Sequence, residues 1–469
     1  MNATATIRTV MEDYIRDTDI TVKRLADLSG VNRGTFSAIL NRNPPKPLSV
    51  SQLDKITQAM GLSEGALYSL FVDECFVLVA PNWRRLRPFL IRCAELEKLD
   101  VIRDILTCLA ERLSHNPAVF DAAEEMFLRG HYPSAILLYE YIIESEQSSH
   151  SERLAISHLR LFQIFEKDGQ KSTETAMRFL NYRKRLPEPL ALDGLLMLAE
   201  MYYLKQQWGD MELMTDELIE LSQAVYKFSG SESQELYQPK YPLIYYYGQA
   251  YLLKAGSFEN RGMFKQAKKW IEHYKDLSWF QGLNDLGKSA VHLFSSYAEA
   301  NLMSIEIKMG NVQAIPRYIN YLKDHPSEIM EGLVTLLESA LKYSFEIDSL
   351  LELFAEELET YNCFNPTTLK KQYKEHFSLR RYENFCRVYS EYCFKTMNYD
   401  EGAKYNLYRL NILLTTQDKA LMADSMLLFE RYREYVSTDL QYKYNYICKE
   451  AWEHEKSQTV AIDGISVCS

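Results

Sequence analysis

The segment "DAAEEMFLRGHYPSAILLYEYIIESE", residues 121–146, combines two helical patterns that are separated by a glycine. Apolar and small side chains recur at intervals of three and four residues on both sides of Gly130, which is the spacing of an amphipathic helix. Glycine adopts the left-handed conformation that ends a helix at low cost. The segment therefore predicts two antiparallel helices joined by a short turn at Gly130.

The small and aromatic residues of this segment have the arrangement of a tetratricopeptide repeat, with small residues in the first helix and Tyr132, Ala135, Ile136 and Tyr139 in the second. Small residues let paired helices approach closely, while aromatic residues fill the space between neighbouring pairs. Weaker versions of the pattern occur at residues 197–218, 245–274, 296–322 and 389–410. Because their intervals vary, we predict degenerate tetratricopeptide-like repeats over residues 116–455, stacked as a right-handed α-solenoid in an all-α protein.

The segment "ADLSGVNRGTFSAILNRN", residues 26–43, forms a tighter corner near the N-terminus. Thr21 can cap a first helix, Gly30 can end it, and Asn32 can cap a second helix. Further short patterns on both sides predict five helices over residues 1–75, with Leu28 on an inward face. A generic helical hairpin inside a larger bundle is the alternative interpretation.

Charge is distributed unevenly along the chain. Residues 21–50 carry a local net charge of +4, from Lys23, Arg24, Arg33, Arg42 and Lys46 against Asp27, whereas the whole chain of 469 residues carries −11. A locally basic surface on an acidic protein favours contact with nucleic acid at that surface alone.

The corner at Gly30 resembles the helix-turn-helix domain of the Cro/repressor (XRE) family. The resemblance implies that residues 33–41 form a recognition helix for the major groove of double-stranded DNA. It implies that Arg33 and Ser37 read base edges, since an arginine fork matches guanine. The residues implied to contact phosphates are Thr21, Lys23, Thr35, Asn41, Arg42 and Lys46. Because one such domain binds weakly, the resemblance implies a homodimer on an operator with two half-sites.

Residues 76–115 are predicted as linker helices that open the solenoid. They contain "NWRRLRPFLIR", residues 82–92, with four arginines. Two interpretations are open for these arginines: contact with DNA phosphates beside the N-terminal domain, or a solvated basic face, which is the more common role of such a cluster.

The C-terminal helices are predicted to hold the dimer together. Residues 405–414 and 421–436 carry more apolar and aromatic side chains than a terminal helix pair needs, so we expect an isologous contact there. Residues 456–469 lack helical periodicity and are predicted to form a C-terminal tail.

Composition and motifs exclude several classes of protein. The eight cysteines contain no CxxC pair, and Cys386 and Cys393 are expected to be buried free thiols rather than metal ligands. No signal-peptide pattern or long apolar run occurs, so a cytoplasmic protein without a membrane partner is expected. Phosphate loops, HExxH and GxSxG motifs are absent, so neither an enzyme nor a cofactor or metal site is predicted.

A helix-turn-helix domain joined to tetratricopeptide repeats resembles the RRNPP superfamily of peptide-sensing bacterial transcription regulators, in particular the arbitrium-type receptors. The resemblance implies quorum-sensing control by a short signalling peptide held in the groove of the solenoid. Asparagine amides would hold the peptide backbone and charged groups its ends. The candidates are Asn301, Asn384, Arg381, Arg387, Tyr247, Gln249, Tyr202 and Asp193.

Among these candidates, Arg381 and Arg387 suit a C-terminal carboxylate, and Asp193 suits an N-terminal amine. Ordinary surface or packing roles stay open for each of them. The alternative function is a helix-turn-helix regulator whose solenoid binds a protein partner or serves only as a dimerisation scaffold.

Overall fold

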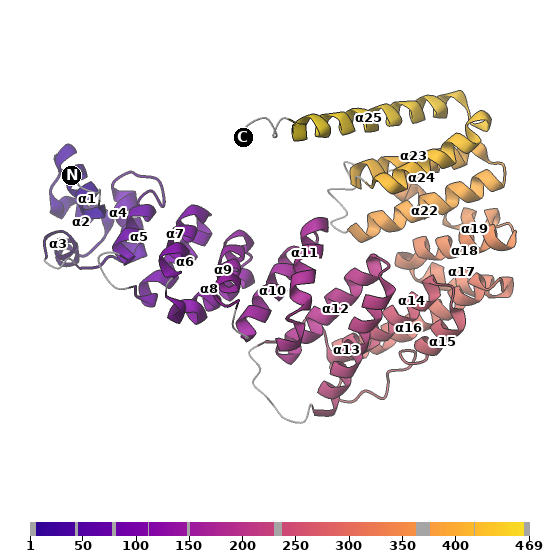
Figure 1. The fold of residues 1–469 in the computed structure, drawn as a ribbon, viewed down its shortest axis with the longest axis horizontal. Coiled ribbons are helices and arrows are strands. Elements are labelled where there is room, and N and C mark those ends of the chain that lie inside the picture. Colours follow the sequence, from indigo (N-terminus) through magenta and orange to yellow (C-terminus); the bar gives the residue numbers. More distant parts are fainter. Residues whose placement is uncertain are drawn as a thin grey trace. The chain divides into compact units, whose positions relative to one another are not determined.

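A computed structural model describes residues 6–42, 46–76, 81–110, 112–147, 151–228, 237–362, 376–416 and 418–463. Every regular element in these ranges is a helix (Figure 1), which confirms the predicted all-α class. The chain forms two compact units, unit 1 with residues 1–198 and 230–240, and unit 2 with residues 199–229 and 241–469. Within the described ranges, no helix is both long enough and apolar enough to cross a membrane.

Five helices form the N-terminal part of unit 1, as predicted. They are α1 (Ile7–Asp17), α2 (Val22–Ser29), α3 (Arg33–Asn41), α4 (Val50–Ala59) and α5 (Tyr68–Phe76). Leu25, Phe36 and Ile39 are fully buried between them. The prediction for Leu28 is wrong, because half of this residue (50%) is exposed on the outer side of α2.

Local signals in the sequence produce the α2–α3 corner. The Thr21 hydroxyl accepts a hydrogen bond from the backbone N–H of Arg24 and so caps α2. Gly30 ends α2 with a φ of 64°, which costs little without a Cβ. The Asn32 side chain then accepts hydrogen bonds from the N–H groups of Gly34 and Thr35 and caps α3.

Helix pairs follow in both units. In unit 1 they are α6 (Trp83–Glu95) with α7 (Leu99–Leu109), α8 (Asn116–Leu128) with α9 (Tyr132–Ser145), and α10 (Glu152–Ile164) with α11 (Gly169–Leu180). The boundary between the units lies inside α12 (Glu188–Leu204).

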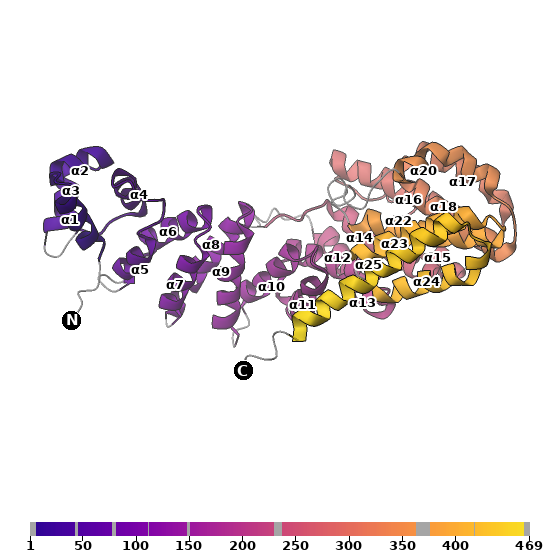
Figure 2. The ribbon, with the colours of Figure 1, turned by 90° about the horizontal axis from the view of Figure 1, so that it is seen from above.

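Unit 2 continues with α13 (Trp208–Phe228), α14 (Leu243–Asn260), α15 (Phe264–Ile271), α16 (Asp285–Lys308), α17 (Ile315–Asp324), α18 (Ile329–Tyr343), α19 (Asp348–Leu351) and α20 (Ala355–Asn362). It ends with α22 (His376–Lys395), α23 (Tyr399–Thr416), α24 (Lys419–Tyr432) and α25 (Thr438–Asp463). Helices α14, α16, α18, α22 and α23 pack side by side in this order (Figure 1, Figure 2).

Six connections between consecutive helices share one backbone feature, a residue with positive φ after the first helix. These residues are Glu97, Gly130, Gln206, Gly262, Gly310 and Met397. In four of the five segments with the repeat pattern the two helices pack against each other, as predicted: α8 with α9, α14 with α15, α16 with α17, and α22 with α23. Their close packing also depends on small residues, since a Cβ at Gly248 in α14 would come within 2.5 Å of the Phe294 ring in α16.

Two expectations about the C-terminal part are corrected. The predicted tail begins inside a helix, because α25 extends to Asp463, and residues 464–469 lie outside the described ranges. Residues 405–414 do not offer an apolar surface to a partner, because Leu407, Leu410 and Leu413 are buried within their own chain. Periodicity alone does not distinguish a helix face buried within the chain from one left for an interface.

Candidate functional site

Helix α3 carries half of the side chains that were predicted to contact DNA. Arg33, the predicted reader of a base, donates two hydrogen bonds to Asp27 of α2, with N–O distances of 2.7 and 2.6 Å. Both residues are exposed, Arg33 by 58% and Asp27 by 38% of the side chain, and Arg33 lowers the pKa of the Asp27 carboxyl. Exposed pairs of this kind are weak, so Arg33 can exchange this partner for another one.

The other predicted DNA contacts also lie at the surface. Lys46 Nζ lies 3.3 Å from the Thr35 hydroxyl, and Asn41 Nδ2 lies 3.3 Å from the Ser37 hydroxyl. All eight predicted residues except the half-buried Thr35 are exposed: Thr21, Lys23, Arg33, Ser37, Asn41, Arg42 and Lys46. Together they make a polar, locally basic surface along α3.

Three of the four arginines of α6 pair with carboxylates of other helices, which corrects the preferred interpretation of a solvated basic face for these three, whereas Arg84 is exposed. Arg85 donates to the carbonyl of Leu48 at 2.9 Å and lies 3.4 Å from the buried carboxylate of Glu74. Arg87 pairs with Glu125 of α8. Arg92 pairs with three carboxylates, those of Asp54, Glu64 and Glu95. These ion pairs connect the N-terminal helices with α6 and α8.

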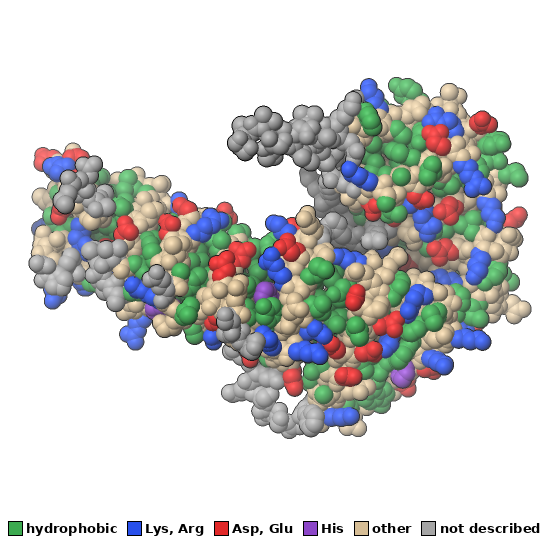
Figure 3. Space-filling view, viewed as in Figure 1, with side chains coloured by type: hydrophobic (Ala, Val, Ile, Leu, Met, Phe, Trp, Pro, Cys, Tyr) green, Lys and Arg blue, Asp and Glu red, His purple; other side chains and the backbone are tan. Residues whose placement is uncertain are grey.

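A polar groove in unit 2 brings together half of the residues that were predicted to hold a peptide. The groove has a volume of about 560 Å³. Asn301 of α16 and Arg381, Asn384 and Arg387 of α22 line it. Its other polar side chains are those of Tyr203, Gln206, Glu259, Asn260, Ser304, Lys308, Tyr318, Tyr321, Glu328, Glu331, Thr335, Glu338, Glu383 and Arg409. On the face of unit 2 drawn in Figure 3, acidic and basic side chains are likewise interspersed.

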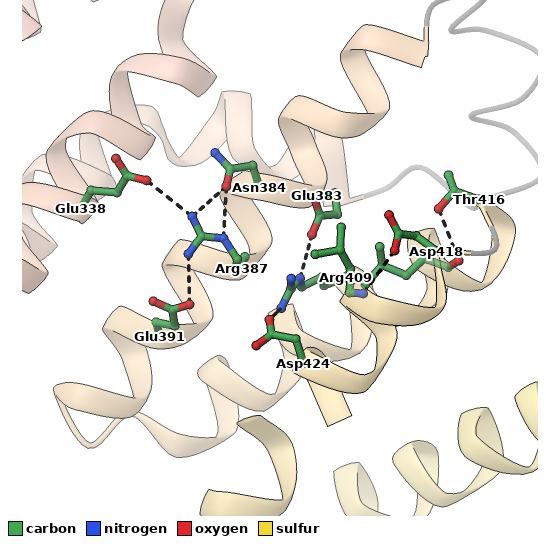
Figure 4. A network of polar contacts seen from close by, with 11 residues as sticks. Glu338, Glu383, Asn384, Arg387, Glu391, Arg409, Thr416, Asp418 and Asp424 are labelled. Atoms are coloured by element: carbon green, nitrogen blue, oxygen red, sulfur yellow. Dashed lines mark hydrogen bonds and ion pairs between the residues drawn. The ribbon is translucent and has the colours of Figure 1, made fainter. Parts of the chain in front are cut away.

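Arg387 is held from three sides (Figure 4). Its guanidinium donates to Glu391 at 3.1 Å, to Glu338 of α18 at 3.4 Å, and to the amide oxygen of Asn384 at 2.9 and 3.2 Å. The amide oxygen of Asn384 is therefore engaged, and Figure 4 shows the amide nitrogen turned away from Arg387. A fixed amide with its N–H groups directed outward can donate to a peptide carbonyl.

Arg409 of α23 belongs to the groove lining, and its side chain is fully buried between acidic partners (Figure 4). Its Nε donates to Glu383 at 2.7 Å, and its Nη1 donates to Asp424 at 2.8 Å. Within the described ranges, Nη2 has no hydrogen-bond partner, and neither has either amide atom of the fully buried Asn406. A buried guanidinium with a carboxylate on two sides fixes the relative positions of α22, α23 and α24.

Glu331 of α18 has the most perturbed carboxyl group of the groove. Burial raises its pKa to about 7, and the neighbouring carboxylate of Glu328 contributes in the same direction. Arg381, whose Nε lies 2.6 Å from the Glu331 carboxylate, opposes this increase. When Glu331 is ionised it compensates this arginine, so a ligand carboxylate would then have to compete with Glu331 for it.

Asn301 of α16 also lines the groove. Its Nδ2 donates to the hydroxyl of the fully buried Tyr274 at 2.9 Å. Beside it, Lys308 Nζ lies 2.8 Å from Glu259, which also accepts from the Ser304 hydroxyl. One amide hydrogen of Asn301 is therefore used to fix the side chain, as a preformed binding site requires.

The other four predicted peptide-binding residues lie outside this groove lining. Tyr247 is buried among Tyr251, Trp279 and Phe280, and Gln249 is half-buried on the same helix. Tyr202 is buried, and the next residue, Tyr203, lines the groove in its place. Asp193 belongs to unit 1, where it accepts a hydrogen bond from the backbone N–H of Lys240.

Several lining residues were missed from the sequence, among them Arg409 and Glu383. Arg409 stands in the apolar segment 405–414, which was interpreted as a dimer surface. The signal that could have identified it is its position three residues after Asn406, since two such polar residues share one face of a helix that is otherwise apolar.

The groove combines asparagine amides, tyrosine hydroxyls and balanced ion pairs on a scaffold of packed helices. Such a surface can exchange hydrogen bonds with an extended polar ligand without large rearrangement. Comparison of the sequence with models of known protein families and with curated proteins finds no match.

Proposed function

We propose that the chain is a sequence-specific DNA-binding transcription regulator controlled by a short signalling peptide. In this proposal, the N-terminal helices are an XRE-type helix-turn-helix domain. The later helix pairs are a tetratricopeptide-like right-handed solenoid of the RRNPP type, whose groove in unit 2 receives the peptide. The regulator acts as a cytoplasmic homodimer.

The exposed polar face of α3 is the observation that carries the DNA-binding part. A helix that buries Phe36 and Ile39 on one side and presents Arg33, Ser37 and Asn41 on the other can enter a major groove with these side chains toward the bases. The cap at Asn32 also keeps the N-terminal N–H groups of the helix ordered. The local charge of +4 favours approach to phosphates.

The groove supports the peptide-binding part. Asn301 and Asn384 each use one end of the amide to bind a neighbouring side chain, which orients the other end. The ion pairs of Arg387 with Glu338 and Glu391 leave little positive charge at this arginine. An uncharged, extended backbone suits this lining better than a strongly charged small molecule does.

Exposed apolar side chains on the C-terminal helices support the homodimer. Leu427 of α24 is 72% exposed. Tyr435, in the turn before α25, is 62% exposed, and Tyr442 of α25 is 73% exposed. A two-fold contact through such a surface would bring two N-terminal domains to one palindromic site. The same surface is compatible with the second candidate function, in which the solenoid is only a dimerisation scaffold.

Selection of bound fragments from random duplex DNA tests the proposal. The full chain should enrich one palindromic motif, and mass spectrometry of the acid extract of the purified protein should detect a short peptide. Recovery of random sequences without a common motif would contradict the DNA-binding part. A motif without any peptide would favour the scaffold function.

A further inference from the structure

A short described segment that follows α13, residues 237–240, lies against the helices of unit 1. The ring of Tyr237 lies under the guanidinium of Arg160 in α10, 5.8 Å from the guanidinium carbon to the ring centroid. The backbone N–H of Lys240 donates to the Asp193 carboxylate of α12 at 3.2 Å. An aromatic side chain and a backbone group three residues later are thus both held by unit 1.

The surface under Tyr237 is fixed by contacts within unit 1. Arg160 is 7% exposed and binds Glu124 of α8 through two parallel hydrogen bonds, at 3.0 and 2.8 Å. Its Nη1 donates to Gln163, and its guanidinium lies over the Phe127 ring at 4.5 Å. A guanidinium held flat in this way presents its face to a second aromatic ring.

The contacts to residues 237–240 are those by which proteins bind extended peptides. A carboxylate accepts a backbone N–H, and a preformed planar site receives a tyrosine. Burial raises the pKa of the Tyr237 hydroxyl to about 12, consistent with a ring that leaves bulk water when it docks. Asp193, which the sequence predicted to bind a peptide amine, here binds a backbone amide of its own chain.

We propose that Arg160 and Asp193, with Glu124 behind them, form a docking site for an extended tyrosine-containing segment, and that residues 237–240 occupy it as a tethered ligand. This site is distinct from the groove in unit 2 and does not depend on the function proposed above. The chain passes into unit 2 on both sides of the segment. Docking therefore acts as a strap that holds part of the connection between α13 and α14 on unit 1, and release of the strap frees this connection.

Hydrogen exchange of the full chain tests the strap, because the Lys240 amide reports directly on docking. In the parent protein this amide should exchange slowly. In Asp193→Ala it should exchange about tenfold faster or more, as expected after loss of a hydrogen bond to a charged acceptor. Trypsin cleavage after Lys240 should accelerate in parallel. Tyr237→Ala should produce the same changes through the other contact.

Gln238→Ala is the matched control, since this exposed residue lies between the two contacts. This substitution should leave the exchange rate of the Lys240 amide and the rate of trypsin cleavage unchanged. Exchange of amides in α10 and α12 reports whether each variant remains folded. If Asp193→Ala unfolds, Tyr237→Ala still tests the proposal, because Tyr237 lies outside any helix. An unprotected Lys240 amide in the parent, or equal exchange in the parent and Tyr237→Ala, would overturn the proposal.

Discussion

The corner at α2–α3 and the groove in unit 2 both contain an arginine bound to a carboxylate, but in opposite surroundings. The Arg33–Asp27 and Arg409–Glu383 pairs have nearly equal N–O distances, 2.6 and 2.7 Å. The Arg33 side chain is 58% exposed, whereas that of Arg409 is fully buried. Water competes with the first pair and screens it, while the second pair is maintained by the cost of exposing or separating buried charges.

This contrast separates recognition from scaffolding. An arginine in a weak exposed pair can leave its partner for a DNA base at little cost. A buried arginine with two acidic partners keeps its helices in one arrangement before any ligand arrives. In the proposed function the same residue type therefore serves opposite purposes, and substitutions at the two positions should have separable effects.

The largest effect is expected from removal of the buried arginine. Arg409→Met leaves Glu383 buried without its cation and should lower the free energy of unfolding by about 3–5 kcal/mol. Chemical denaturation measures this change. In the double variant Arg409→Met/Glu383→Met most of the loss should be recovered, since no buried charge is then left unpaired and the remaining carboxylate, that of Asp424, is 62% exposed. Arg33→Met, the exposed counterpart, should leave the unfolding midpoint unchanged, and equal losses in both single variants would refute the contrast.

The next effect concerns DNA affinity. Arg33→Ala should weaken binding to a selected duplex by about tenfold to a hundredfold and relax the preference at one base position, because a base contact is lost. Lys46→Ala should weaken binding to all duplexes alike and reduce the salt dependence, because it removes a phosphate contact. Fluorescence anisotropy at several salt concentrations distinguishes the two outcomes. If both variants bind as the parent does, α3 is not the recognition helix.

A smaller effect is expected in the groove. Asn301→Ala should weaken binding of the peptide extracted from the protein by about tenfold, because a buried backbone group of the peptide loses its partner. Binding of DNA without peptide should remain at the parent level. Isothermal titration calorimetry measures the affinity for the peptide. Gln249→Ala, outside the groove lining, is the control, and a loss of equal size there would assign the peptide to another surface.

The smallest effect is a pH dependence of stability. Because the pKa of Glu331 is raised from 4.5 to about 7 in the folded protein, the protonated form is the one that the fold favours. The stability contributed by this proton is present at low pH and should be lost as pH rises from about 4.5 to 7. Since 43% of the side chain is exposed, solvent should keep the change small. Denaturation at pH 5 and pH 8 should show this loss of stability in the parent and not in Glu331→Gln. An identical pH dependence in both proteins would contradict the assignment to Glu331.

Local features were the most predictable from the sequence. The caps at Thr21 and Asn32, the turn at Gly30 and the hairpin at Gly130 were predicted correctly, because each depends on a few adjacent residues. The positive φ of Met397 had no such signal, since methionine adopts this conformation only when the surrounding helices require it.

The candidate groove was predictable only in part. Asn301 of α16 and Arg381, Asn384 and Arg387 of α22 were identified, because each stands on a helix with a clear apolar periodicity. Arg409 was missed because its partners, Glu383 and Asp424, come from two other helices, and no spacing within one helix reveals such a contact. Tyr202 was chosen in place of Tyr203 because periodicity does not fix the orientation of this helix about its axis to within one residue, which corresponds to about 100°.

The central claim is that a peptide in the groove changes DNA binding by the N-terminal helices. The direct measurement is the affinity of the full chain for its selected duplex at fixed salt, with and without saturating peptide recovered from the protein. The account predicts a change of about five- to 150-fold, corresponding to 1–3 kcal/mol of coupling, with the same factor in the effect of DNA on peptide affinity. An unchanged DNA affinity at demonstrated saturation with peptide would contradict it.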